Sequence, residues 1–291
     1  MKTYNIIVLV KQVPDTRNVG PGAMKPDGTV NRGKLPSIFN PDDLAALEMA
    51  LKIKDAHPGS HVTVLTMGPP KAAEIMRESL YRGADKAILV SDRRFGGADT
   101  LATSYTLAQA IKKIGDYDLI FGGRQAIDGD TAQVGPQTAE KLGLPQVTYA
   151  LEITDIGESH IDVRRKIDHG TELVRAPIPC LLTVHGEAPA CRPPVAKRVM
   201  KYKYARSASE MSKANDTVRH RIELYPELTI HEWNVEAIDA DPSRIGLAGS
   251  PTKVKSVESV AFTAAESKRF DATAEDIDRL IVELIEKHTI G

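Results

Sequence analysis

The sequence predicts an α/β protein with a mostly parallel sheet flanked by helices. Four short apolar runs, at 4–10, 61–67, 86–91 and 119–121, are typical of buried strands in a parallel sheet. Helical patterns separate these runs, and an alternation of strand and helix calls for a parallel sheet covered on both faces. From Gln146 the strands follow one another without helices, which predicts an antiparallel extension.

Length and charge limit the functional classes. The 291 residues are enough for one large or two modest domains. We predict a nucleotide-binding α/β domain over 1–190, which includes the antiparallel strands from about residue 146, and a tail with a C-terminal arm over 191–291. The 38 Lys and Arg residues balance 39 Asp and Glu residues, which gives no global attraction to nucleic acid or to an anionic membrane.

Cysteine usage and the first residues indicate a soluble cytoplasmic protein. Cys180 and Cys191 have neither CxxC spacing nor histidines at metal-ligand intervals, which argues against a disulfide framework and a zinc site. The apolar run at the start is too short to span a bilayer and lacks a cleavage site. No acid/base pair, nucleophile triad or metal cluster stands out in the sequence.

The first half of the chain contains the predicted strands of the parallel sheet, each followed by a loop and a helix. The strand at 4–10 ends before Lys11, a position where open α/β sheets bind ligands, although a solvated edge residue is an equal alternative. Residues 17–37 predict a long exposed loop. Asn40 to Asp43 begins a helix that continues to Ala56, since an early proline and acids in the first turn are start signals.

The next elements complete the parallel pattern. The strand at 61–67 is followed by Gly68 and a helix to Tyr81, and the strand at 86–91 is followed by a helix over 99–114. The stretch from Tyr117 to Gly143 then contains a strand, two glycines, a polar loop and a helix expected from Thr131.

This strand, glycine loop and helix start is the usual arrangement for holding a phosphate, because unpaired amides and the helix dipole favour an anion. It matches neither GxxxxGK[ST] nor GxGxxG. We expect one of Asp128 and Asp130 to cap the helix, and the other to order the loop or accept from ribose hydroxyls. A capped loop without a ligand is the alternative on pattern alone.

The second half predicts consecutive antiparallel strands over 146–155, 160–168, 172–178 and 179–185. The proline-rich and basic segment 185–206 has little propensity for core structure. Residues 207–272 are polar and weakly patterned, and the stretch 222–239 within them allows a strand and a turn. The last helix, 274–288, has an apolar stripe that we expect to dock on another chain or back on the sheet; the stripe comprises Ile277, Leu280, Ile281, Leu284 and Ile285.

The run GGRQAIDGDTAQVGPQTA (122–139) resembles the nucleotide-binding loop of the electron-transfer flavoprotein β subunit, in a form more similar to the electron-bifurcating branch. In that family the loop surrounds the phosphates of AMP or, in bifurcating members, of FAD, on an adenine-nucleotide α-hydrolase-like fold. The resemblance implies cofactor-binding roles for Leu9, Val10, Lys11, Asn40, Pro41, Asp42, Met67, Gly68, Gly122, Gly123, Arg124, Gln125, Asp128, Gly129, Asp130, Thr131, Ala132, Gln133, Val134, Gly135, Thr138 and Arg165.

A second run, VRRKIDHGTELVRAPIPCLLT (163–183), resembles the β-subunit signature of the same family, except that His169 stands where Gly or Asp is usual. The resemblance places Arg165 near a flavin or the partner subunit, whereas the residue pattern alone favours a solvated strand tip. The segment 185–206 resembles the family's recognition loop for flavoprotein dehydrogenases, and 244–254 resembles the start of an arm that wraps the partner.

The resemblance implies a heterodimer with an electron-transfer flavoprotein α subunit that carries another FAD. In the bifurcating branch, FAD on this chain takes hydride from NADH. Electrons then pass to the α-subunit FAD, on to an acyl-CoA dehydrogenase, and to ferredoxin or flavodoxin. One alternative is a conventional subunit with structural AMP. The other is a stand-alone ATP-binding stress-type protein, against which the long C-terminal arm argues.

Overall fold

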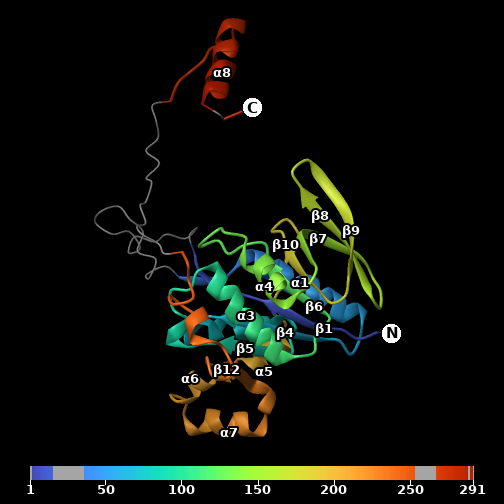
Figure 1. The fold of residues 1–291 in the computed structure, drawn as a ribbon, viewed down its shortest axis with the longest axis vertical. Coiled ribbons are helices and arrows are strands. Elements are labelled where there is room, and N and C mark those ends of the chain that lie inside the picture. The colour runs from blue at the N-terminus through green and yellow to red at the C-terminus, as the bar shows by residue number, and fades with distance from the viewer. Residues whose placement is uncertain (1, 16–35, 253–266, 288, 291) are drawn as a thin grey trace, which may run out of the picture.

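The computed structural model describes residues 2–15, 36–252, 267–287 and 289–290. The described residues form a ten-stranded sheet and a separate two-stranded one, β2 (Gln12–Pro14) with β3 (Ser37–Phe39). In spatial order the large sheet contains β11 (Arg206–Ser207), β12 (Thr229–Trp233), β5 (Lys86–Val90), β4 (His61–Met67), β1 (Asn5–Leu9), β6 (Leu119–Gly123), β10 (Cys180–Val184), β7 (Gln146–Ile156), β8 (His160–Ile167) and β9 (Gly170–Pro177) (Figure 1).

The predicted fold class is confirmed. Every neighbouring pair from β11 to β7 is parallel, and β7, β8 and β9 form the antiparallel extension. The prediction that 179–185 continues the antiparallel series is wrong: β10 is parallel to both β6 and β7. All five of its residues are buried, as expected for a central strand covered on both faces.

Helices cover both faces of the parallel part. One face packs against α1 (Pro41–Ala56), α2 (Ala73–Arg82) and α5 (Ala196–Tyr202), and the other packs against α3 (Thr100–Ile114) and α4 (Val134–Leu142). Successive residues of β1 point to opposite sides. Ile6 and Val8 therefore join the first core with Leu47 of α1, whereas Ile7 joins the second with Ile111 of α3.

The predicted helix boundaries hold, with one correction. Asn40 precedes α1 and Asp99 caps α3 by accepting from the Ala102 amide (3.0 Å). The helix expected from Thr131 begins only at Val134. Asp130 and Ala132 have φ angles of 50° and 52°, in the left-handed region, and a right-handed helix excludes both.

The segment 185–206 is more structured than its composition predicts. Its helix α5 packs on α2 and buries Tyr202. The Arg198 guanidinium donates to the carbonyls of Leu80 (2.6 Å) and Ala84, and Arg192 binds the buried Glu48 carboxylate through its main-chain amide and its side chain. These contacts fix a segment whose residue pattern alone predicts little core structure.

Residues beyond α5 return to the sheet. Between β11 and β12 lie α6 (Ala208–Met211) and α7 (Asp216–Leu224), and β12, which falls within the stretch 222–239 where a strand was allowed, pairs with β5. The short 3-10 helices are Pro70–Ala72, Arg93–Phe95, Pro226–Leu228 and Pro242–Arg244. The domain boundary near residue 190 stays a prediction, and the loop expected at 17–37 lies almost entirely outside the described residues.

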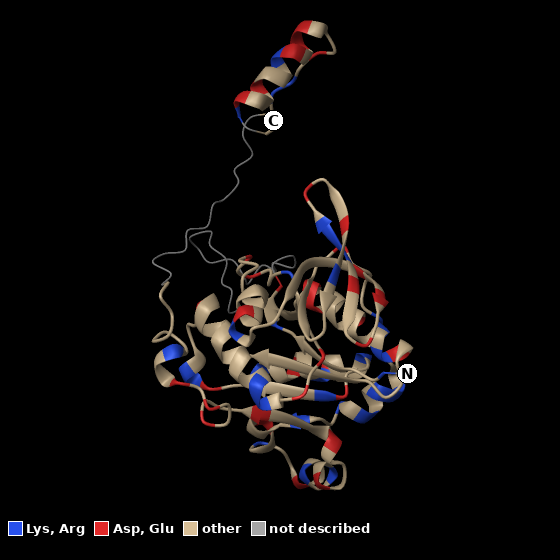
Figure 2. Ribbon diagram, turned by 45° about the vertical axis from the view of Figure 1, so that its right-hand side comes forward, with Lys and Arg blue, Asp and Glu red and all other residues tan. Residues whose placement is uncertain are grey.

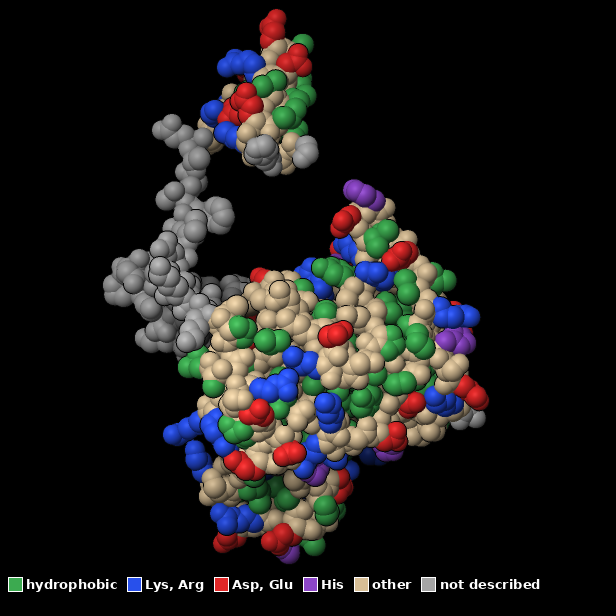
Figure 3. All heavy atoms as spheres, in the orientation of Figure 1, with side chains coloured by type: hydrophobic (Ala, Val, Ile, Leu, Met, Phe, Trp, Pro, Cys, Tyr) green, Lys and Arg blue, Asp and Glu red, His purple; other side chains and the backbone are tan. Residues whose placement is uncertain are grey.

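The last helix, α8 (Ala274–Glu286), is confirmed, with Thr273 as its cap. None of its residues is buried, and Figure 3 shows hydrophobic side chains along one side of it. What covers this stripe stays a prediction. Positively and negatively charged residues are interspersed along the rest of the described chain (Figure 2). Across the described residues we find no helix with the length and apolar character needed to cross a bilayer.

Candidate functional site

The order of the strands identifies one edge of the sheet as the place for a ligand. From β1 the chain proceeds to β4 and β5 on one side and then reverses to β6 on the other. In open α/β sheets, ligands bind at the carboxyl ends of the strands where such a reversal occurs. The predicted residues Leu9, Val10, Met67 and Gly68 lie at these ends, as do Gly122 and Gly123.

The start of α1 holds the loop that follows β6. The Asn40 side-chain amide donates to the Gln125 carbonyl (2.8 Å), and its oxygen accepts from the Ile127 amide (3.2 Å). Asn40 is fully buried, so both bonds are sheltered from water. The Asn-Pro turn predicted as a ligand contact therefore also fixes the main chain of the loop, which we call the cradle loop (124–133).

Asp43 joins the ends of β1 and β6 and was missing from the predicted site. Its carboxylate accepts from the Lys11 amide (2.8 Å) and from the Gly123 amide (2.9 Å). Burial raises the pKa of Asp43 to about 7, although hydrogen bonds from Asn40, Gly123 and Lys11 favour its charged form. In sequence, an acid in the first turn of a helix is already explained by the helix dipole, so no signal pointed to this tertiary role.

Gly123 is required by the close approach of α1. A Cβ atom at this position would lie 2.4 Å from Asp43 Oδ1 and 2.7 Å from the Asp42 main-chain carbon. Gly135, in the first turn of α4, is similarly close to Thr183, whose methyl carbon would lie 2.5 Å from an added Cβ. The two glycines allow α1 and α4 to pack tightly against the ends of β6 and β10.

The cradle loop is further held by its own side chains. Gln125 donates to Asp130 (2.7 Å), and the Lys11 ammonium contacts both carboxylate oxygens of Asp128 (2.8 Å each). The expectation that one of these acids caps the following helix is wrong, because both carboxylates have these other partners. The residue before α4 is Gln133, and its side chain forms no capping hydrogen bond.

The uncapped start of α4 suits an anion. The first amides of a helix have no intrahelical acceptor, and the helix dipole is positive at this end. At α4 these are the amides of Val134 and Gly135, since Pro136 has none. A phosphate placed here would receive the hydrogen bonds that a capping side chain otherwise supplies.

Arg124 and Asp42 leave polar atoms without partners beside the cradle loop. Arg124 Nε lies 3.6 Å from Asp42 Oδ2, and within the described part of the chain neither buried atom has a hydrogen-bond partner. Burial raises the pKa of Asp42, whereas the Arg124 guanidinium lowers it. Unpaired buried polar atoms are uncommon in folded proteins, and a polar ligand at this edge would supply partners for them.

Comparisons with known proteins identify the family of the chain. The sequence profile of the "Electron transfer flavoprotein domain" matches residues 27–209. The chain belongs to the electron transfer flavoprotein family. A protein named electron transfer flavoprotein subunit beta, from Clostridium acetobutylicum, is 46% identical over 251 residues, which cover 86% of each chain.

Two further relatives of this electron transfer flavoprotein chain match along almost their whole length. The caffeyl-CoA reductase-Etf complex subunit CarD of Acetobacterium woodii is 44% identical and covers 98% of this chain and 99% of its own. The acryloyl-CoA reductase electron transfer subunit gamma of Anaerotignum propionicum is 40% identical with the same coverage. The family assignment therefore extends to the C-terminal arm.

One predicted residue of this family member forms its side-chain hydrogen bonds within the antiparallel extension. The Arg165 guanidinium, on β8, donates to the carbonyl and hydroxyl oxygens of Thr148 (2.9 and 3.0 Å) and to Glu172 (3.0 Å). These bonds tie it to the antiparallel extension. The remaining predicted residues belong to the strand ends, to α1, to the cradle loop or to the first turns of α4, where Thr138 is buried and donates to the Val134 carbonyl (2.7 Å).

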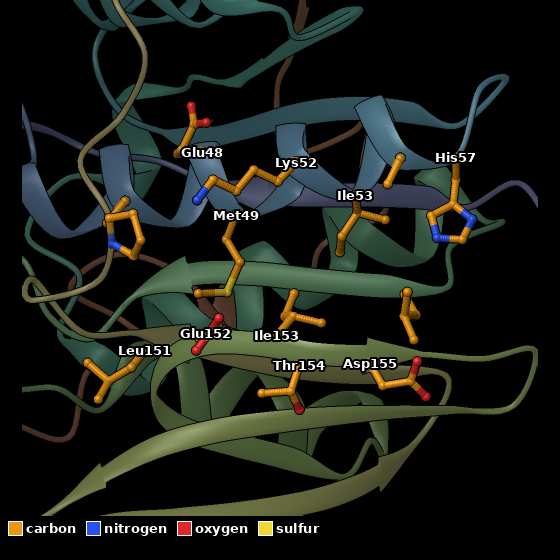
Figure 4. Close-up of a pocket in the computed structure, with 14 residues that line it drawn as sticks. Glu48, Met49, Lys52, Ile53, His57, Leu151, Glu152, Ile153, Thr154 and Asp155 are labelled. Carbon is orange, nitrogen blue, oxygen red and sulfur yellow. The ribbon is translucent and has the colours of Figure 1, made fainter.

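A cavity of about 430 Å³ lies elsewhere, between α1 and β7. Figure 4 shows Met49 and Ile53 pointing from α1 toward Ile153 on the strand. Its lining is largely apolar, and Glu48 at its rim is bound to Arg192 (2.8 Å). This cavity contains none of the residues predicted to bind nucleotide.

The raised pKa of Asp43 predicts a stability that depends on pH. Between its ordinary pKa of 3.8 and the folded value of about 7, the folded protein binds more protons than the unfolded chain at this residue. The contribution of Asp43 to the free energy of unfolding is thus greatest below pH 3.8 and declines as the pH rises to about 7. Urea denaturation of wild type and of Asp43→Asn should show a difference that changes over this range and is constant above it. A constant difference between pH 4 and 7 would contradict the assignment.

Proposed function

We propose that this chain is the β subunit of a heterodimeric electron transfer flavoprotein and binds FAD in the cradle. The observation that supports this most directly is the uncapped start of α4 beside a loop held in place by Asn40 and Asp43. In this proposal the α4 amides bind the phosphates, and Arg124 and Asp42 supply polar contacts nearby. The bound flavin would supply the redox chemistry, while the protein holds and orients it.

The bifurcating branch is the finer part of the proposal. Here NADH gives hydride to FAD on this chain, and electrons pass to the FAD of the α subunit and to ferredoxin or flavodoxin. Similarity to subunits of caffeyl-CoA reductase and acryloyl-CoA reductase complexes supports an acyl-CoA dehydrogenase-type partner. Segment 185–206 is the proposed docking surface, because Val195 and Met200 are 45% and 62% exposed beside several lysines. The cytoplasmic location stays a prediction.

The deciding experiment is to count the nucleotides. The chain is co-expressed with its α subunit, the purified complex is denatured, and FAD and AMP are separated by chromatography. Two FAD and no AMP per heterodimer are expected. One FAD with one AMP would replace the bifurcating proposal by a conventional subunit, since the cradle offers the same phosphate contacts to both ligands. Neither nucleotide in a folded complex would contradict the cradle itself.

A double variant tests the location of this nucleotide. Asp128→Ala with Thr131→Ala removes the partner of Lys11 and a hydroxyl of the cradle loop. Nucleotide occupancy of this subunit should fall at least tenfold at limiting nucleotide, a loss that corresponds to roughly 1.4 kcal/mol of binding free energy. Flavin in the α subunit should remain. Asp216→Ala with Thr217→Ala, two exposed positions on α7, is the matched control and should retain full occupancy.

A further inference from the structure

A second concave site lies on the outer side of α3 and α4. It is a cavity of about 410 Å³ that the segment 243–251 closes from one side. Leu101 and Tyr105 come from α3, and Lys141 comes from the last turn of α4. The closing segment contributes Ser243, Arg244, Ala248, Gly249, Ser250 and Pro251.

The only charged residues that line this cavity in the described chain are two cations, Lys141 and Arg244. Neither side chain forms an ion pair or hydrogen bond with another described residue, and the Arg244 guanidinium lies over the Tyr105 ring (4.1 Å). Burial and the nearby charge of Arg244 lower the pKa of Lys141. The nearby acid Asp241 accepts from the amide and hydroxyl of Ser243 (2.9 and 2.7 Å), and those bonds together with the charge of Arg244 lower its pKa, but it forms no ion pair with Arg244.

The closing segment is firmly attached, so the two cations are held near each other. Asp99 accepts from the amide and hydroxyl of Thr252 (3.1 and 2.7 Å), and its own amide donates to Ser250 (2.8 Å). Ser250 in turn donates to the Gly246 carbonyl (2.6 Å). Gly249 crosses so close to Arg244 that an added Cβ would lie 2.0 Å from the Arg244 carbonyl carbon.

We propose that this cavity binds a small organic anion through Lys141 and Arg244. Two like charges held together in a concave, partly desolvated site repel each other. A bound anion attracts both cations and offsets the free-energy cost of their repulsion. The end of the α4 dipole favours Lys141, and the Tyr105 ring favours Arg244, but neither contact gives these cations an ion pair among the described residues. The volume exceeds that of a phosphate, and the walls formed by Leu101, Ala248 and Pro251 suit an apolar portion of the ligand.

The shared chemistry is a phosphate or carboxylate group on a compact organic molecule. This site is separate from the cradle, although both touch the start of α3, where the Thr100 hydroxyl bonds to Gln133 (3.1 Å). The inference does not depend on which nucleotide the cradle holds. It requires only that the cavity exist in the folded subunit.

The test uses the full-length chain in complex with its α subunit and with its nucleotides bound. Inorganic pyrophosphate and citrate are titrated separately by calorimetry, which distinguishes phosphate from carboxylate as the preferred group. Saturable binding of at least one is expected. Lys141→Gln and Arg244→Gln should each weaken it about tenfold or more, because each removes a charge-assisted contact. Lys112→Gln, an exposed cation on α3 that does not line the cavity, is the control and should bind as wild type.

A second readout is the Lys141 side chain itself. Its pKa, followed by NMR, should rise when the anion is present, because the anion offsets the charge of Arg244. Absence of saturable binding, or binding that both variants retain, would overturn the proposal. Weaker association of both variants with the α subunit, without any anion binding, would also overturn the proposal. That result would mean that Lys141 and Arg244 form ion pairs with a carboxylate of the α subunit.

Discussion

Replacing Gly123 by alanine is expected to abolish nucleotide binding and to destabilise the fold. The new Cβ would lie 2.4 Å from Asp43 Oδ1 and 2.7 Å from main-chain and side-chain carbons of Asp42. The Asp43 carboxylate is held by hydrogen bonds from two main-chain amides, and Asp42 contributes a main-chain carbon, so α1 or the end of β6 must shift. Overpacking of this kind costs about 1–3 kcal/mol, and occasionally more. Chemical denaturation and the nucleotide content of the purified complex measure the two effects.

Gly129→Ala is the matched control for this substitution. Gly129 lies in the same cradle loop, an added Cβ there meets nothing within 4 Å, and its φ angle is outside the left-handed region. The control should retain wild-type stability, and the comparison concerns unfolding alone because Gly129 is itself one of the predicted cofactor-binding residues. If Gly123→Ala behaved like Gly129→Ala, α1 would not pack against β6 as described.

Replacing Asp43 by alanine is the second change expected to have a large effect. It leaves the amides of Lys11 and Gly123 without their acceptor, at a position where the Asp43 side chain is buried. Each unpaired buried amide costs about 1–3 kcal/mol. Removal of a buried carboxylate offsets part of this loss. The free energy of unfolding should still fall, and the cradle should lose nucleotide, because the ends of β1 and β6 are no longer tied together.

Asp118→Ala provides the comparison, because Asp118 directly precedes β6 at the end of the strand opposite to Gly123. Asp118 accepts from the Asn5 amide (2.8 Å), but its side chain is 23% exposed. Water can replace that acceptor, so the loss should stay within about 0.5–1.5 kcal/mol and nucleotide content should be unchanged. Equal losses in both variants would show that burial does not govern the role of Asp43.

The sequence was informative wherever local chemistry decides the structure. Apolar runs located β1, β4, β5 and β6, and an early proline with acids in the first turn located the start of α1. Pattern located β10 as a strand too, but could not show its neighbours, because pairing depends on where the chain returns. The late start of α4 depends on the left-handed backbone of Asp130 and Ala132, which ordinary propensities do not indicate.

In the candidate site, too, the sequence predicted features that are contiguous along the chain and missed contacts between distant residues. Resemblance and pattern identified the cradle loop and the Asn-Pro turn, because both are contiguous in sequence. Asp43 could not be identified, since its role comes from two amides that reach it from Lys11 and Gly123, distant along the chain. The sequence predicted Asp128 as a possible cap of the following helix. Its actual partner, Lys11, follows the end of β1 and is distant from Asp128 along the chain, so local pattern could not indicate this contact.

The position of β10 has a consequence for how the protein is made. This strand is synthesised after β7, β8 and β9, yet it lies between β6 and β7. Until Cys180–Val184 leaves the ribosome, the nascent sheet has an open apolar edge along β6, and the finished β7–β9 hairpins have no strand to attach to. An open strand edge pairs readily with other chains. The interval before β10 arrives is therefore the stage of synthesis at which newly made copies are most exposed to aggregation.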